Sequence, residues 1–174
     1  LASYMPKWND TDEPIAYLIT FRSYGTWLAG DRRGSIDKYH NQYGGSRAVP
    51  SKLRNAEHAT RLKTPPFLLN STSRQLVERA IREVCRVRNW SLIAINVRTN
   101  HVHVVVAAHR SSARMLNDLK SYSTRALRAS GEWTFDHSPW VDKGSRRNLW
   151  NEDHITSASE YVTNGQGGPL PEFD

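Results

Sequence analysis

The sequence predicts an α+β fold: a ferredoxin-like (split βαβ, RRM-like) sandwich with an antiparallel sheet and an added C-terminal helix that carries a tyrosine. Strand-like and helix-like patterns follow one another in the order strand, helix, strand, strand, helix. A fourth strand or extended segment is expected near residues 132–150, and the length of 174 residues suits one domain. A sheet of this kind carries helices on one face and leaves the other face open.

Runs of β-branched and aromatic residues indicate the first three strands. Residues 15–21 (Ile-Ala-Tyr-Leu-Ile-Thr-Phe) indicate a buried strand, and residues 90–97 indicate a second. Residues 98–100 make a tight turn into a third strand at residues 101–106. The second and third strands are therefore expected to form a hairpin.

Helical periodicity indicates three further segments. One helix is expected over residues 71–88, where a Ser-Thr-Ser start signal precedes apolar residues at helical spacing. A second follows a cap at Ser111 or Ser112 and ends at Gly131. A last short helix is expected over residues 151–164, with an apolar stripe along one side.

These elements imply one domain with less regular surroundings. Residues 1–14 are polar and indicate an N-terminal arm, and the domain is expected over residues 15–168. Residues 29–66 are rich in Gly, Arg, Lys, Asn and Pro, which predicts a long irregular insertion. Residues 169–174 form a C-terminal tail.

The composition favours an intracellular protein with an anionic partner. Lys and Arg number 24 against 17 Asp and Glu, and six Trp and seven Tyr add stacking surface. This balance fits either nucleic-acid binding or a merely basic domain. The single cysteine, Cys85, allows no intramolecular disulfide, and no apolar stretch or signal peptide is evident. We therefore expect a cytoplasmic protein with no membrane partner.

The segment Asn-His-Val-His-Val-Val-Val contains two histidines on one strand. Because strand side chains alternate, His101 and His103 point to the same side. Val102, Val104 and Val106 point to the opposite side and can be buried in the core. The valines are expected to face the helices, and the histidines the open face of the sheet.

Two histidines are either half-buried structural residues or part of a metal site. They are too few for a zinc centre, and no Cys-x-x-Cys is present. A zinc hydrolase of the His-x-His-x-Asp-His type is disfavoured because no Asp follows closely. Two imidazoles with a third oxygen ligand suit Mg²⁺ or Mn²⁺ held partly by a substrate phosphate.

Tyr161, on the last expected helix, is a candidate nucleophile. It lies beside the apolar stripe of that helix, so it is either a boundary residue packed on the sheet or a group that attacks phosphorus. A helix laid on the open sheet face would place it over the two histidines. Tyr122 is a rival nucleophile, but it lies on the apolar side of its helix, which favours core packing or base stacking.

Taken together, these motifs resemble the single-tyrosine HUH (His-hydrophobic-His) transposases, and most closely those associated with repetitive extragenic palindromes. The matching pieces are Asn-His-Val-His at residues 100–103 and Glu-Tyr-Val-Thr-Asn-Gly-Gln-Gly at residues 160–167. Phe-Arg-Ser-Tyr-Gly-Thr-Trp-Leu at residues 21–28 and Gly-Ser-Arg-Arg-Asn-Leu-Trp at residues 144–150 complete the set. The likeness spans residues 15–168 in the expected order.

The resemblance implies an endonuclease and strand transferase that cuts single-stranded DNA next to a hairpin or palindromic end. His101 and His103 would bind Mg²⁺ or Mn²⁺, and Tyr161 would form a 5′-phosphotyrosine and free a 3′-hydroxyl. A 3′-hydroxyl of another strand would reverse the step without ATP. Some relatives take a third ligand from a Gln four residues after the tyrosine; this chain has Gly165 there, which leaves Gln166 as the candidate. The resemblance further implies a bacterial, nucleoid-associated protein that is a monomer or a homodimer.

Several residues are candidates for DNA binding. Gly25, Thr26 and Trp27 match an N-terminal signature of the family, and Trp27 would either stack on bases or pack in the core. The candidates for phosphate contacts are Arg32, Arg33, Lys143, Arg146 and Arg147. Two other functions stay open on the residues alone: a non-catalytic nucleic-acid-binding module of the same fold, and a metal-dependent phosphoesterase that uses water.

Overall fold

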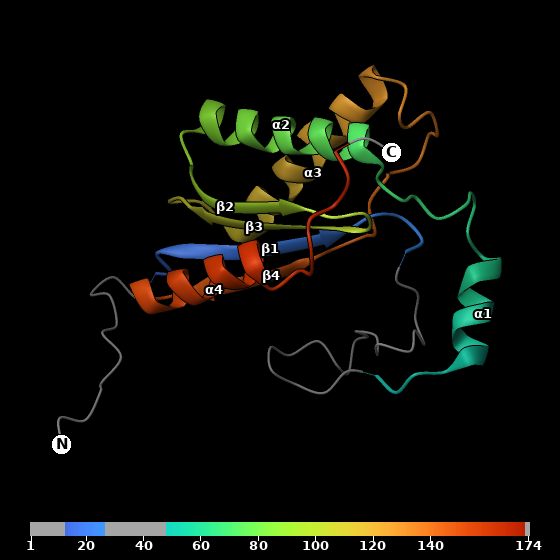
Figure 1. The fold of residues 1–174 in the computed structure, drawn as a ribbon, viewed down its shortest axis with the longest axis horizontal. Helices are drawn as coiled ribbons and strands as arrows, with labels where there is room; N and C mark the ends of the chain where they lie inside the picture. The colour runs from blue at the N-terminus through green and yellow to red at the C-terminus, as the bar shows by residue number, and fades with distance from the viewer. Residues whose placement is uncertain (1–12, 27–47, 173–174) are drawn as a thin grey trace.

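The computed structural model describes residues 13–26 and 48–172, and within them four strands form one antiparallel sheet (Figure 1). The elements in chain order are β1 (Ala16–Arg22), α1 (Lys52–Thr60), α2 (Ser71–Arg88), β2 (Ser91–Val97), β3 (His101–Ala107), α3 (Ser112–Ala129), β4 (Ser145–Leu149) and α4 (Glu152–Asn164). The strand order across the sheet is β2-β3-β1-β4. The ferredoxin-like sandwich expected from the sequence is confirmed, because β1-α2-β2 and β3-α3-β4 interleave in this order.

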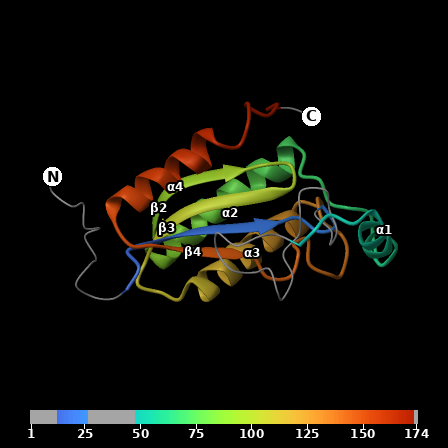
Figure 2. The same cartoon turned by 90° about the horizontal axis from the view of Figure 1, so that it is seen from below.

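The helices lie on both faces of the sheet. Helices α2 and α3 cover one face, and α4 lies across the other, over β2 and β3 (Figures 1 and 2). The expected open face is therefore occupied in part by the added C-terminal helix. The two strands that meet under this helix, β2 and β3, form the expected hairpin.

Strand β3 separates two apolar clusters by the alternation of its side chains. Val102, Val104 and Val106 are fully buried in the large cluster shared with α2 and α3. Val105 points the other way and packs with Ala158 of α4 in a small cluster. His101 and His103 share the face of Val105, as the period of two requires. The division of β3 into a valine face and a histidine face is therefore as expected.

Helix α4 begins where the sequence indicates. The side chain of Asn151 accepts a hydrogen bond from the backbone N–H of His154 at 2.9 Å, which caps the helix. Glu152 and Asp153 lie in the first turn, where negative charge stabilises the helix dipole. Helix α3 is capped by Ser111.

One expectation about the irregular regions needs correction. The stretch 29–66, expected to be irregular, contains the helix α1, which has no buried residue and stands apart from the sheet (Figure 1). The fourth strand expected near residues 132–150 is present as β4. The arm at residues 1–14 lies almost wholly outside the described residues. None of the helices in the described ranges is long and apolar enough to cross a bilayer.

Candidate functional site

The two histidines of β3 lie side by side beneath α4. Their ring centroids are 4.7 Å apart. Nδ1 of His101 lies 2.6 Å from the side-chain oxygen of Asn100, and Nδ1 of His103 lies 2.7 Å from the hydroxyl of Thr20. An imidazole that donates from Nδ1 leaves the lone pair of Nε2 available to a ligand. The contacts of Asn100 and Thr20 thus fix the ring orientation that a metal site needs.

His103 is held in its neutral form by its surroundings. It is 5% exposed, and burial lowers the pKa of its imidazole from 6.5 to about 4. The charges of His101 and Arg22 contribute to this lowering, and a hydrogen bond with Gln166 opposes it. A neutral imidazole at neutral pH is the form that binds a metal ion.

Tyr161 lies on α4 directly above this pair. Its ring meets the ring of His103 edge to face, with 5.4 Å between centroids, and its side chain is 49% exposed. Neighbouring Ala158 and Val162 point down into the small apolar cluster, so Tyr161 sits at the edge of the buried stripe. The side chain of Asn96 on β2 donates to the carbonyl of Val162 at 2.8 Å and holds this turn on the sheet.

Gln166 returns to the histidines although it stands five residues after the tyrosine. The helix stops at Asn164, and the chain turns at Gly165. The side-chain nitrogen Nε2 of Gln166 donates to the carbonyl of Tyr161 at 2.9 Å. The side-chain oxygen Oε1 of Gln166 then lies 3.3 Å from Nε2 of His101. An ideal helix would have turned this side chain off the tyrosine face; the break at Gly165 brings it back.

The facing atoms of His101 and Gln166 suit a shared cation. The amide of Gln166 is oriented by its bond to Tyr161, so Oε1 presents lone pairs to the imidazole. Nδ1 of the same ring already meets the acceptor oxygen of Asn100. A cation bound by both Nε2 and Oε1 would satisfy these two acceptors at once.

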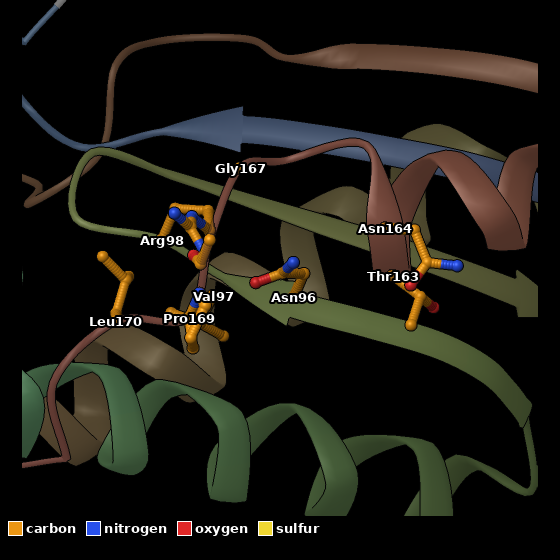
Figure 3. A pocket seen from close by; sticks show the side chains of 9 residues that line it. Asn96, Val97, Arg98, Thr163, Asn164, Gly167, Pro169 and Leu170 are labelled. Atoms are coloured by element: carbon orange, nitrogen blue, oxygen red, sulfur yellow. The ribbon is translucent and has the colours of Figure 1, made fainter.

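The segment that follows Gln166 is anchored along the edge of β2. Arg98 donates to the carbonyl of Gly168 at 3.0 Å, and the buried Arg74 of α2 donates to the carbonyl of Pro171 at 2.5 Å. A groove lies between this segment and β2, and Figure 3 shows Arg98 beside Gly167 there. These contacts fix the position of the turn that carries Gln166.

Comparison with known proteins decides the family. Residues 59–163, more than half of the chain, match the family model described as "Transposase IS200 like". The chain belongs to the IS200-like transposase family. It is thus a member of a family of DNA-processing enzymes, as the motif resemblance implied.

The fold of this transposase is similar to solved structures at low identity. One is a REP-associated tyrosine transposase bound to a REP hairpin, with 13% identity, a TM-score of 0.48, and coverage of 93% of this chain and 70% of that chain. Another is a protein from Deinococcus radiodurans R1 assigned as a transposase, with 15% identity, a TM-score of 0.48, and coverage of 94% and 100%. Among curated proteins, no relative matches the chain.

The Gly-Thr turn of this transposase, Gly25-Thr26, contacts the turn that precedes His101. Gly25 has φ of +72°, and a Cβ there would approach Cα of Pro66 to 3.0 Å, so glycine suits the position. The hydroxyl of Thr26 donates to the carbonyls of Ser23 at 2.8 Å and Asn100 at 3.3 Å. The Thr26 hydroxyl therefore holds the turn that precedes His101. Trp27, Arg32 and Arg33, which were expected to contact DNA, lie outside the described residues.

The basic residues near β4 divide between the two faces of the sheet. Arg147 is paired with Leu18 of β1, which places it on the α4 face with the histidines. Its neighbour Arg146 points the other way and contacts the hydroxyl of Ser112 on α3 at 3.4 Å. Lys143 is exposed in the preceding loop. Only Arg147 of these three lies on the histidine face.

Tyr122 belongs to the face of the sheet opposite to that of the histidines. It belongs to α3, packs at the edge of the large apolar cluster, and carries the guanidinium of Arg125 4.3 Å above its ring. Its partly buried environment fits core packing, one of the two roles expected from its helix face. Thr20, Asn100 and Asn96 are site residues that sequence reasoning missed. Asn100 carried a local signal, because it immediately precedes His101.

Proposed function

We propose that this transposase is a metal-dependent single-strand DNA endonuclease and strand transferase that acts through a phosphotyrosine at Tyr161. The observation that carries the proposal is the edge-to-face contact of Tyr161 with His103 in the same chain. A half-exposed hydroxyl-bearing ring above two oriented imidazoles is an arrangement suited to nucleophilic attack on a phosphate. The contact within one chain supports action of Tyr161 together with the histidines of the same molecule.

The bond changes at Tyr161 balance without an external energy source. The tyrosine oxygen attacks phosphorus, the bond from phosphorus to the 3′ oxygen breaks, and the phenolic proton ends on the leaving 3′-hydroxyl. The product is a 5′-phosphotyrosine. The 3′-hydroxyl of a second strand attacks the same phosphorus, and Tyr161 leaves with its proton restored. Each step exchanges one phosphoester bond for another, so no ATP is needed.

His101, His103 and Gln166 would hold the metal ion in this proposal. Two imidazole nitrogens and one amide oxygen suit Mn²⁺ or Mg²⁺, with further positions open to a substrate phosphate. The neutral His103 and the facing acceptors of His101 and Gln166 support this assignment. A bound ion would polarise the phosphate and stabilise its developing charge.

The proposed substrate is single-stranded DNA beside a hairpin or palindromic end. This part rests on the motif resemblance, from Asn-His-Val-His to the Gly-Thr turn, together with the net charge of +7. Candidate contacts on the described face are Arg147 and the edge of the Gly-Thr turn. Lys143 and Arg146 are weaker candidates because they lie off the histidine face.

The test is a covalent capture experiment. A 5′-labelled and a 3′-labelled hairpin oligonucleotide with single-stranded flanks are each incubated with the protein and Mn²⁺, then run on a denaturing gel. We expect a protein adduct that retains the 3′ label, is absent with a chelator and is lost in Tyr161→Phe. Tyr122→Phe is the matched control and should retain the adduct. Cleavage that survives in Tyr161→Phe would contradict the proposal and indicate attack by water.

A further inference from the structure

A group of aromatic rings lies where the segment that joins α3 to β4 meets the residues after β1, at the end of the sheet where β1 finishes (Figures 1 and 2). Phe135 and His137 are stacked, with 14° between ring planes and 5.7 Å between centroids. The ring of His137 also contacts that of Tyr24, tilted by 45° with 4.5 Å between centroids. We call Phe135, His137 and Tyr24 the aromatic stack. Phe135 is its outer ring and is 43% exposed.

The backbone of the aromatic stack is held rigidly by side chains. The guanidinium of Arg128 donates to the carbonyls of Phe135 and His137 at 3.3 Å and of Asp136 at 3.0 Å. The indole N–H of the buried Trp133 donates to the carbonyl of His137 at 2.8 Å. The ring of Trp133 also contacts Phe135 edge to face at 4.9 Å. Phe135 is therefore a preorganised surface ring on a fixed base.

The aromatic stack is connected to the candidate active site by backbone contacts. Tyr24 donates its backbone N–H to the carbonyl of Pro139 at 2.7 Å, which ties β1 to the aromatic segment. The adjacent Ser23 donates its backbone N–H to the carbonyl of Asn100 at 3.0 Å. Asn100 in turn contacts the ring of His101. Tyr24 of the aromatic stack is therefore the chain neighbour of Ser23, which is hydrogen-bonded to the turn that precedes His101.

The exposure of Phe135 points to a nucleobase as its partner. Among the aromatic side chains of the described residues, only Phe135 and Tyr161 are in the exposed class. Tyr161 has a role in the proposed chemistry, whereas Phe135 has no hydroxyl and no reactive atom. Its sequence neighbours Thr134 and Asp136 are exposed and polar, which disfavours the contiguous apolar patch of a protein interface. A lone flat ring on a basic protein fits one base of a single strand.

We propose that Phe135 is a stacking site for a nucleobase in the single-stranded DNA that flanks the cleavage point. The inference rests on the proposed function for its substrate class. A base stacked on Phe135 would continue the Phe135-His137 pair by one layer and hold the strand near the turn before His101. Base–aromatic stacking tolerates any base, so the site would set the position of the strand and not its sequence.

The test measures binding without cleavage. In a Tyr161→Phe background, a hairpin oligonucleotide with single-stranded flanks is titrated by fluorescence anisotropy, and 2-aminopurine is placed at successive flank positions. We expect Phe135→Ala to weaken binding by about 5- to 100-fold. At one flank position, 2-aminopurine should be quenched by the parent protein and should regain its fluorescence with Phe135→Ala. Phe135→Trp should keep both the affinity and the quenching.

Controls separate the stack from general effects on folding and surface. Val87→Ala removes an exposed apolar side chain from α2 (52% exposed) and should leave affinity unchanged. Equal binding and equal quenching by Phe135→Ala would overturn the stacking site alone, leaving the cleavage chemistry intact. An equal loss in Val87→Ala would also overturn it. A parent protein that binds none of the oligonucleotides would overturn both the site and the proposed substrate.

Discussion

The two faces of the sheet use the same strands for opposite purposes. The face under α2 and α3 is a large apolar cluster in which Val104 and Ile19 are fully buried. The face under α4 has a small cluster around Val105, and beyond it the side chains are polar: Thr20, His103 and Arg147. The first face stabilises the fold, and the second holds the residues of the candidate site on that stable sheet.

A single strand, β3, contributes residues to both faces. Consecutive residues of β3 alternate between the faces, so His103 and Val104 are chain neighbours with different environments. Substitutions of His101 and His103 should therefore affect chemistry. Substitutions of Val102 and Val104, on the other face, should affect stability.

Removal of a histidine should give the largest effect. We expect His101→Ala to lower DNA cleavage by about 100-fold or more, because a metal ligand and the partner of Gln166 are lost together. The free energy of unfolding should change little, because the ring is only half-buried. Single-turnover cleavage and urea unfolding measure the two quantities. A folded variant with unchanged cleavage would remove His101 from the site.

Acid should destabilise the metal-free protein through His103. Its folded pKa of about 4 lies below the unfolded value of 6.5. The unfolded chain therefore takes up the proton first, so this contribution is fully present above about pH 6.5 and is lost as the pH falls toward 4. The loss should reach roughly 3 kcal/mol. Urea unfolding with a chelator present, at about pH 7 and about pH 4.5, measures it.

The variant His103→Gln supplies the control for that pH dependence. Other carboxylates titrate in the same range, but their contribution is common to both proteins. The difference between the parent and His103→Gln should therefore shrink as the pH falls. Identical slopes in the two proteins would show that His103 is not the buried titrating group.

Shortening a valine on the other face should affect stability alone. Val104→Ala removes two methyl groups from a fully buried site and should lower the free energy of unfolding by about 2 kcal/mol. The melting temperature should fall by roughly 4–8 °C. At a temperature well below melting, cleavage per folded molecule should match the parent. A selective loss of cleavage would show that the two faces are coupled.

The smallest effect should separate two adjacent arginines. Arg147→Ala removes a charge from the histidine face and should weaken single-strand binding by about 3- to 10-fold, with the slope of log K against log salt reduced by about 0.7. Arg146→Ala, on the α3 side, should change both quantities less. Anisotropy titrations over a salt series compare the pair. A larger effect for Arg146 would place the DNA on the other face.

The sequence predicted those parts of the molecule that depend on local periodicity. Alternation along β3 gave the faces of His101 and Val102, and the apolar stripe of α4 gave the placement of Tyr161 beside Val162. Both follow from the fixed geometry of a single element. The family motifs supplied the expectation that these two elements meet.

Other parts of the molecule depend on how the strands pair or on where a helix ends, and local sequence patterns do not encode these. The contact of Thr20 with His103 follows from the pairing of β1 with β3, a relation between residues 83 positions apart. The return of Gln166 depends on the break at Gly165. Helix α1 was missed because it buries no residue, although its cap, Ser51, accepts from the backbone of Arg54 and was a local signal.

In the proposed mechanism, the phenolic oxygen of Tyr161 becomes bonded to a phosphorus atom of the DNA. The most direct measurement is mass spectrometry of the trapped adduct after nuclease and trypsin digestion. Tyr161 lies in the tryptic peptide that begins at Asn148, and Tyr122 lies in the short peptide of residues 121–125. We expect a nucleotide remnant on Tyr161 in the first peptide. A remnant on Tyr122, or cleaved DNA with no adduct on either peptide, would contradict it.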